Sequence, residues 1–230
     1  MGLAGGVRPH PRALVFDLDR CLIDPRNAWR YCIEEAVALA SGTRLSAAEL
    51  VAEYHQRPWR HALGVLLDTP DAVTRCAELS QAMFERSAMK KLLVHEGVAM
   101  ALDALRAESI ELGAISRLPH ALAIKQIHST GLDRFLAVLS ATPEGEPWRP
   151  RERFETCLAF LEAEPAQSGF VSGEEPDLSE ISGAGTVCFR AAWAPLPSGD
   201  LHSSSERWPI IGVPSESTAV VVRRWAGRGS

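Results

Sequence analysis

The sequence predicts a three-layer α/β protein in which a central parallel sheet is joined to an all-helical second domain. Three observations predict this fold class. Residues 13–16 form a short apolar strand that ends in Asp17. Residues 25–91 then show only helical patterning, with no strand pattern between them. From residue 96 onward, short apolar strands alternate with amphipathic helices, which is typical of parallel strands joined by right-handed crossovers.

Turn and capping residues divide the helical block. Its first helix ends at Gly42. Its second begins at Ser46 with Glu49 three residues later, the arrangement of a capping box. Helices are therefore predicted over residues 27–40, 46–55, 59–67 and 71–89.

The second part of the chain supplies the rest of the predicted sheet. Strands are predicted over residues 110–115, 135–139, 169–172 and 186–190. Helices are predicted over residues 96–108, 119–130, 151–163 and 177–184. Two Pro-rich stretches, 143–150 and 194–214, are predicted to be loops. The α/β core therefore comprises residues 1–24 and 92–230, and the helical domain is inserted over residues 25–91.

Composition narrows the class of partner. Of the 230 residues, 46% are hydrophobic and 23% charged, which is typical of a globular protein. The net charge of −5 argues against a nucleic-acid or anionic-membrane partner, because such partners usually select a basic surface. No apolar run approaches the roughly 20 residues that span a bilayer. The five cysteines are scattered, without a Cys-x-x-Cys pair. We expect a cytoplasmic protein with reduced thiols that binds neither nucleic acid nor membrane. Its oligomeric state is not indicated.

Polar side chains follow the predicted strands. In sheets of this kind, ligands bind outside the carboxyl ends of the strands. The relevant segments are Asp17-Leu18-Asp19, Ser116-Arg117, the loop from Ser140 to Arg149, and Ser172 to Asp177. All of them carry acid or hydroxyl groups, and the third adds a cation, so a polar site is predicted at this edge.

Asp17 and Asp19 are the most informative residues of that edge. Two carboxylates this close repel, so ionising both requires a cation or strong hydrogen-bond donors. One carboxylate could attack phosphorus while the other moves a proton. Mg²⁺, which shares its coordination shell between carboxylates and phosphate, would offset the repulsion. The alternative is a pair of acids in a solvated loop.

Residues 13–24, Ala-Leu-Val-Phe-Asp-Leu-Asp-Arg-Cys-Leu-Ile-Asp, resemble motif I of the haloacid dehalogenase-like superfamily, an apolar strand followed by Asp-x-Asp-Gly-Thr-Leu. Residues 111–116 are similar to motif II, residues 148–150 to motif III, and residues 170–185 to motif IV. The helical block resembles that family's cap domain. The resemblance implies a Rossmann-like core and a hydrolase that acts on a small phosphorylated metabolite.

The resemblance also implies roles for individual residues. Asp17 is similar to the nucleophile that forms an aspartyl-phosphate, and Asp19 to the acid and base. Ser116 would position the transferred group. Arg149 would stand where the family has a Lys that neutralises charge.

A metal site and substrate contacts are implied as well. The Mg²⁺ ligands would be Asp17, the backbone carbonyl of Asp19, and an acid of motif IV, either Glu174 or Asp177. Arg20 and Arg117 are candidates to bind the anionic substrate.

The sequence departs from the family pattern at several positions. Arg20-Cys21 replaces Gly-Thr, Arg149 replaces Lys, and Gly173 falls where motif IV usually has its first Asp. Two alternatives therefore stay open. The chain could be a metal-free 2-haloacid dehalogenase-type hydrolase, although such enzymes lack a second Asp at position 19. It could instead retain the fold with weakened or lost catalysis and serve binding or regulation.

Overall fold

The structure is a computed structural model. It describes residues 11–42, 44, 63–64, 67, 69–194 and 207–226. The predicted helix over 46–55 and most of the one over 59–67 lie outside the described residues. None of the described helices has an apolar stretch of the length that a membrane crossing requires.

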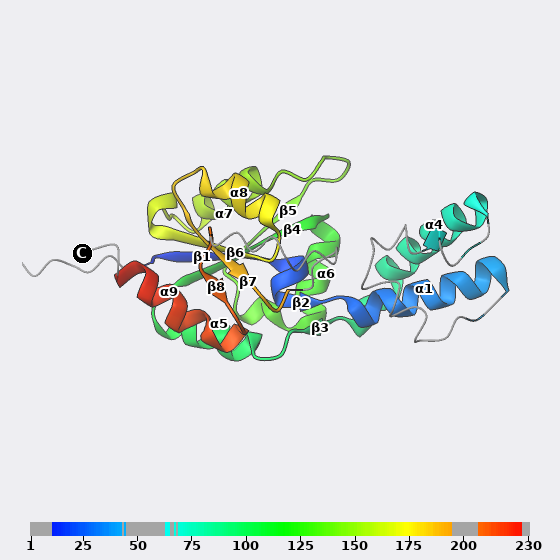
Figure 1. The fold of residues 1–230 in the computed structure, drawn as a ribbon, viewed down its shortest axis with the longest axis horizontal. Helices are drawn as coiled ribbons and strands as arrows, with labels where there is room; N and C mark the ends of the chain where they lie inside the picture. The colour runs from blue at the N-terminus through cyan, green and yellow to red at the C-terminus, as the bar shows by residue number, and fades with distance from the viewer. Residues whose placement is uncertain are drawn as a thin grey trace, which may run out of the picture.

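A parallel sheet of six strands forms the centre of the molecule, in the order β5-β4-β1-β6-β7-β8 (Figure 1). The strands are β1 (Ala13–Asp17), β4 (Glu111–Pro119), β5 (Val138–Thr142), β6 (Ser168–Ser172), β7 (Val187–Ala191) and β8 (Ile210–Ile211). The predicted fold class is confirmed. The prediction for β5 lay three residues too early, and β8 falls in a stretch predicted to be loop.

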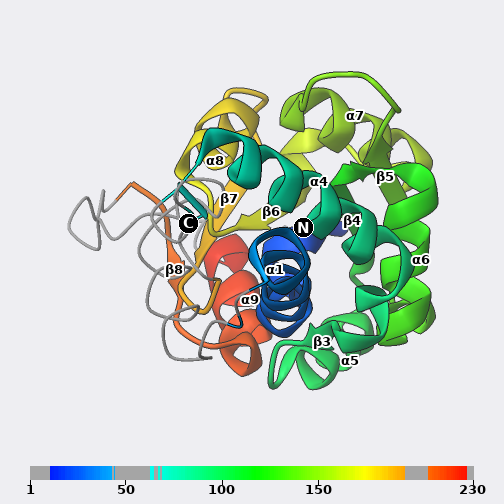
Figure 2. The same cartoon turned by 90° about the vertical axis from the view of Figure 1, so that its right-hand side faces the viewer.

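Helices cover both faces of the sheet, which gives the three layers (Figures 1 and 2). On one face lie α7 (Pro150–Phe160) and α8 (Glu175–Ser182). On the other lie α5 (Val98–Ala107), α6 (His120–Thr130) and α9 (Ser217–Ala226). Side chains alternate along β1, so Ala13 and Val15 pack toward α7 and α8, while Leu14 and Phe16 join the opposite cluster.

Close packing also explains a glycine in β4. A Cβ at Gly113 would collide with the Sγ of Cys157 in α7. The helix therefore approaches the strand backbone more closely than any other residue at this position would allow.

The described part of the helical insert projects to one side of the sheet (Figure 1). It contains α1 (Arg26–Ser41) and α4 (Pro70–Arg86), which lie in the chain between the two strands of a short antiparallel pair, β2 (Ile23–Asp24) and β3 (Leu93–Val94). The Thr69 hydroxyl accepts from the Ala72 N–H at 3.2 Å and caps α4. The two helices share an apolar cluster separate from the two clusters of the core. We continue to refer to residues 25–91 as the cap; the exact domain boundaries stay a prediction.

Candidate active site

The site is built at the carboxyl edge of the sheet, around Asp17 at the end of β1. The Asp17 side chain is buried, with 1% of its surface exposed. Its neighbours come from the flanking strands, because parallel strands in register bring their ends together. Ser172, which ends β6, donates from its hydroxyl to Asp17 Oδ2 at 3.1 Å. A strand end on each side therefore holds the carboxylate in one orientation.

Asp19 lies in a π-helical turn, Leu18–Leu22, that directly follows β1. π-helical turns are rare in proteins, and those that occur often lie at functional sites. Its own N–H donates to Asp17 Oδ1 at 3.2 Å. Its carboxyl accepts from the Ser116 hydroxyl at 2.9 Å and from the Arg117 N–H at 2.7 Å. The turn and the end of β4 therefore position the two acids against each other.

The pKa of Asp19 is raised to about 6. Burial is the main cause, because it penalises the charged form, and the nearby Asp17 adds to it. The hydrogen bonds from Arg117 and Ser116 act in the opposite direction. A carboxyl with this pKa exchanges a proton near neutral pH, which suits an acid that later acts as a base.

Arg117 supplies the cation that contacts both Asp17 and Asp177. Its Nη1 lies 3.3 Å from Asp17 Oδ2, and its Nη2 lies 2.5 Å from Asp177 Oδ2. The guanidinium also lies over the ring of Trp148, 4.7 Å from its centroid. Burial would lower the pKa of Arg117, but the surrounding carboxylates, Asp17 and Asp177 first, raise it above its ordinary value.

Asp177 completes this group from the first turn of α8. It is buried, and its other oxygen, Oδ1, accepts from the indole N–H of Trp148 at 3.2 Å. Burial raises its pKa, and the charge of Arg117 opposes that shift. Asp177 is therefore held by one cation and one neutral donor.

A second ion pair joins Arg20 to Glu174, with Nη1 and Oε1 2.9 Å apart. The backbone around Arg20 is fixed by His95, whose Nε2 lies 2.8 Å from the Arg20 carbonyl oxygen. The neighbouring Cys21 is fully buried, and burial together with Asp17 raises the pKa of its thiol. The replacement of Gly-Thr by Arg20-Cys21 thus adds a cation and an inert thiol.

Arg149 lies elsewhere, and this corrects the expectation that it neutralises Asp17. Its side chain is 55% exposed and pairs with Glu152 at 2.8 Å. Arg149 is the residue before the first turn of α7, where an acid three residues on is its nearest charge partner. The preceding residue, Trp148, enters the site instead, and Arg117 provides the positive charge.

Ser172 and Trp148 belong to the site although no sequence motif assigns them a role. The position of the Ser172 hydroxyl at the end of a buried strand could have indicated that it belongs to the site. The direction of Trp148 depends on how the loop before α7 folds, which no local pattern determines.

The residues that the resemblance implies as metal ligands, Asp17, Asp19, Glu174 and Asp177, all lie in or beside this group. Asp17, Glu174 and Asp177 offer hard oxygen atoms, the donor type that Mg²⁺ prefers. However, Asp17 and Asp177 are bridged by the guanidinium of Arg117, and Glu174 is paired with Arg20. Within the described residues, no group of three or more His, Cys, Asp or Glu side chains is arranged to hold a metal ion. As they stand, these residues do not fit Mg²⁺.

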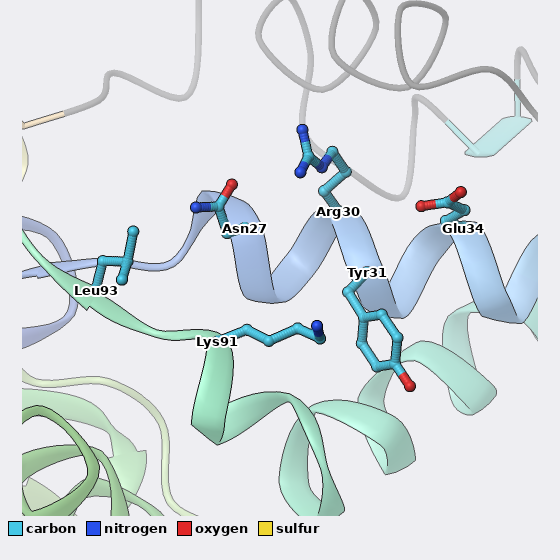
Figure 3. A pocket seen from close by; sticks show the side chains of 6 residues that line it. All are labelled: Asn27, Arg30, Tyr31, Glu34, Lys91 and Leu93. Carbon is cyan, nitrogen blue, oxygen red and sulfur yellow. The ribbon is translucent and has the colours of Figure 1, made fainter.

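A separate pocket lies where the cap joins the core (Figure 3). Its volume is about 420 Å³. The lining residues come from α1, the end of the 3₁₀ turn after α4, and β3: Asn27, Arg30, Tyr31, Glu34, Lys91 and Leu93. The ammonium of Lys91 lies 4.5 Å from the centroid of the Tyr31 ring. The pocket thus contains two cations, Arg30 and Lys91, and one acid, Glu34, whereas the site around Asp17 contains a pair of neighbouring carboxylates.

A parallel sheet whose first strand ends in a carboxylate pair places the protein among α/β enzymes that act through a strand-end aspartate. Comparison with known proteins makes this specific. Residues 14–188 match the family model of the haloacid dehalogenase-like hydrolases. The chain belongs to that family and is a hydrolase of it. No curated protein sequence matches the chain.

Solved structures agree on the fold. A hydrolase of this superfamily from Geobacter sulfurreducens PCA is 17% identical, with a TM-score of 0.73 over 95% of this chain and 100% of that one. A predicted phosphoglycolate phosphatase from Haemophilus somnus 129PT is 16% identical, with a TM-score of 0.71 over 94% and 99%. CbbY from Rhodobacter sphaeroides, in complex with phosphate, is 14% identical, with a TM-score of 0.62 over 90% and 96%.

Proposed function

We propose that this hydrolase is a phosphatase that cleaves a small phosphorylated metabolite through an aspartyl-phosphate on Asp17. The observation that carries the proposal is that two neighbouring aspartates have different surroundings. Asp17 is buried and held by Ser172, whereas Asp19 beside it has a pKa raised to about 6. One acid is thus placed to attack and the other to move a proton.

The reaction follows from these two roles. An oxygen of Asp17 attacks phosphorus, the bond to the ester oxygen breaks, and that oxygen takes the proton of Asp19. The Asp19 carboxylate then takes a proton from water. The oxygen of that water attacks phosphorus, phosphate leaves, and the Asp17 carboxylate is regenerated.

Neighbouring groups would assist both steps. Ser116 holds the Asp19 carboxyl through its hydroxyl, so the proton donor keeps its position. Arg117 offers a guanidinium beside the attacking carboxylate, where planar donors suit phosphate oxygens. Arg20 is a second candidate contact for the substrate anion. Mg²⁺ dependence, which the family resemblance implies, is not part of this proposal, because Arg117 and Arg20 engage the carboxylates in question.

The relatives support the choice of phosphate chemistry. One similar structure is that of a predicted phosphoglycolate phosphatase, and another, that of CbbY, is a complex with phosphate. Asp19 also favours phosphate over a carbon–halogen bond, because it supplies a proton donor that an ester oxygen needs and a departing halide does not.

The test is hydrolysis of p-nitrophenyl phosphate and of a panel of phosphorylated metabolites. Asp17→Asn should lower kcat by at least roughly 10³-fold, the scale expected when a nucleophile is removed. Asp103→Asn, a change of the same kind at an exposed position on α5, should leave kcat unchanged.

Three results would contradict the proposal. Undiminished turnover in Asp17→Asn would remove Asp17 as nucleophile. Halide release from a 2-haloacid, without any phosphate release, would assign the chain to the dehalogenase alternative. Lack of turnover on every substrate would favour the binding or regulatory alternative.

A further inference from the structure

Arg117 lies where two acids from distant parts of the chain face each other. Asp17 ends β1, and Asp177 lies in the first turn of α8. The guanidinium contacts Asp17 Oδ2 at 3.3 Å with one nitrogen and Asp177 Oδ2 at 2.5 Å with another. It therefore bridges the two carboxylates, as a bound cation would.

Several contacts fix this side chain in place. One face of the guanidinium lies over the indole of Trp148, and the same indole donates to Asp177. The backbone N–H of Arg117 is anchored on Asp19 at 2.7 Å. Because both ends of the residue are held, a departure of the guanidinium would break two ion pairs and an aromatic contact together.

A metal ion would compete for the same place. The family resemblance implies that Asp17 and an acid of motif IV, either Glu174 or Asp177, would hold Mg²⁺. Arg117 contacts Asp17 and the second of these candidates. An Arg side chain stays protonated at any accessible pH, so it cannot become neutral to admit a divalent ion. Mg²⁺ would have to displace the guanidinium from both carboxylates and then tolerate its charge nearby.

We propose that Arg117 is the resident cation of this site, taking the place of a divalent metal ion between Asp17 and Asp177. The inference rests on the proposed function, since it assigns the charge neutralisation of that reaction to a side chain. It makes Mg²⁺ unnecessary for holding the acids together and unfavourable as a ligand of them.

The guanidinium keeps donors for a substrate. It carries five N–H groups, of which one on each of two nitrogens is directed at a carboxylate. The Arg117 side chain is 27% exposed, whereas the Asp17 side chain that it contacts is 1% exposed, so Arg117 forms the more solvent-facing part of this pair. A phosphoryl group that approaches Asp17 therefore meets Arg117 beside it.

Titration calorimetry with MgCl₂ tests the inference without any turnover. The wild-type protein should bind Mg²⁺ only weakly. Arg117→Ala should bind it at least about tenfold more tightly, because a repelling charge is removed from between two carboxylates. Arg117→Lys retains the charge, so it should stay as weak as the wild type. Arg151→Ala removes an exposed Arg that pairs with Glu155 on α7, so it controls for net charge and should not change binding.

Tight, one-to-one Mg²⁺ binding by the wild type would overturn the inference, and so would equal affinities of wild type and Arg117→Ala. The wild-type and Arg117→Lys measurements decide the matter if Arg117→Ala does not fold.

A second arm separates this inference from the proposed function. Hydrolysis of p-nitrophenyl phosphate by the wild type should be unchanged after EDTA treatment. Turnover that EDTA abolishes and Mg²⁺ restores would overturn the role of Arg117 and leave the phosphatase proposal intact. Weak Mg²⁺ binding without turnover in either condition would contradict the phosphatase proposal and leave the role of Arg117 intact.

Discussion

The strand-end site around Asp17 and the pocket of the cap differ in how their polar groups are held. At the strand ends, Asp17, Asp19 and Asp177 each have at least two described partners, which come from β4, β6, the turn after β1 and the loop before α7. In the pocket, Arg30 and Lys91 are exposed side chains on one helix and one turn. The first arrangement is rigid and suits chemistry, whereas the second can adapt to different ligands.

The packing beneath the two regions differs in the same way. The site rests on strands whose side chains belong to the two large clusters of the core. The cap has its own smaller cluster, which includes Ile33 and Val37 of α1 and Cys76 of α4. At the base of the cap, Trp29 stacks on Phe84 at 4.4 Å and joins the core cluster. The cap is thus anchored at one end and packs on itself at the other.

Apart from loss of the nucleophile, the largest effect should come from removing the proton donor of the site around Asp17. Asp19→Asn should lower kcat by roughly 10²- to 10⁴-fold, the range typical of general acid–base catalysis. Because the pKa of Asp19 is raised to about 6, the wild-type carboxyl keeps its proton to higher pH than an ordinary Asp and loses it above about pH 6. The step that needs the donor should therefore slow as pH rises, so kcat/KM should fall above that value.

The pH profile separates a catalytic role from a structural one. Asn cannot titrate, so the fall of kcat/KM above about pH 6 should be missing from whatever activity Asp19→Asn retains. A variant with the wild-type pH profile at reduced rate would show that Asp19 is not the proton donor.

Truncating one buried side chain in the cap and one in the sheet should show whether the two regions unfold separately. Ile33→Ala in the cap cluster should cost about 2–4 kcal/mol, and Phe170→Ala in β6 about 3–5 kcal/mol. Hydrogen exchange should show where the loss is felt. In Ile33→Ala, protection should fall in α1 and α4 while the sheet keeps its protection, whereas Phe170→Ala should weaken the sheet itself. Equal loss of protection everywhere in Ile33→Ala would show that cap and core open as one unit.

The sequence predicted the sheet well where strands are buried on both faces. β1, β4, β6 and β7 were recognised because continuous apolar runs end in polar residues. The prediction for β5 began at Phe135, which is buried but belongs to the turn before the strand. β8 has two residues and exists through pairing with β7, so no local pattern could indicate it. α9 was missed although Val221 and Trp225, four residues apart, are both buried.

The site was predictable up to the direction of its side chains. The strand-end rule brought Asp17, Asp19 and Ser116 together, and the structure places them in contact through hydrogen bonds. The strand-end rule could not decide which of two arginines contacts Asp17. Arg149 and Arg117 both follow predicted strands, but a side chain's direction depends on its loop and on which acids are buried nearby.

The smallest effect should come from the pocket of the cap, at Lys91. Its ammonium lies 4.5 Å from the Tyr31 ring at an exposed position, where such a contact is worth about 0.5–1 kcal/mol. Lys91→Gln should lower the free energy of unfolding by that amount, measured by urea titration. The change should leave kcat unaltered, because Lys91 belongs to the pocket and not to the group around Asp17.

The same variant tests whether the pocket takes part in substrate binding. With Arg30 and Lys91 against Glu34, the pocket has one more cation than acid, so a phosphorylated substrate that reaches it should bind less well without Lys91. We expect KM to rise severalfold in Lys91→Gln. Lys90→Gln, an exposed neighbour that does not line the pocket, should leave KM unchanged. Equal KM values in wild type and both variants would mean that the Asp17 site alone binds the substrate. Lys91 would then contribute to the stability of the cap and not to catalysis.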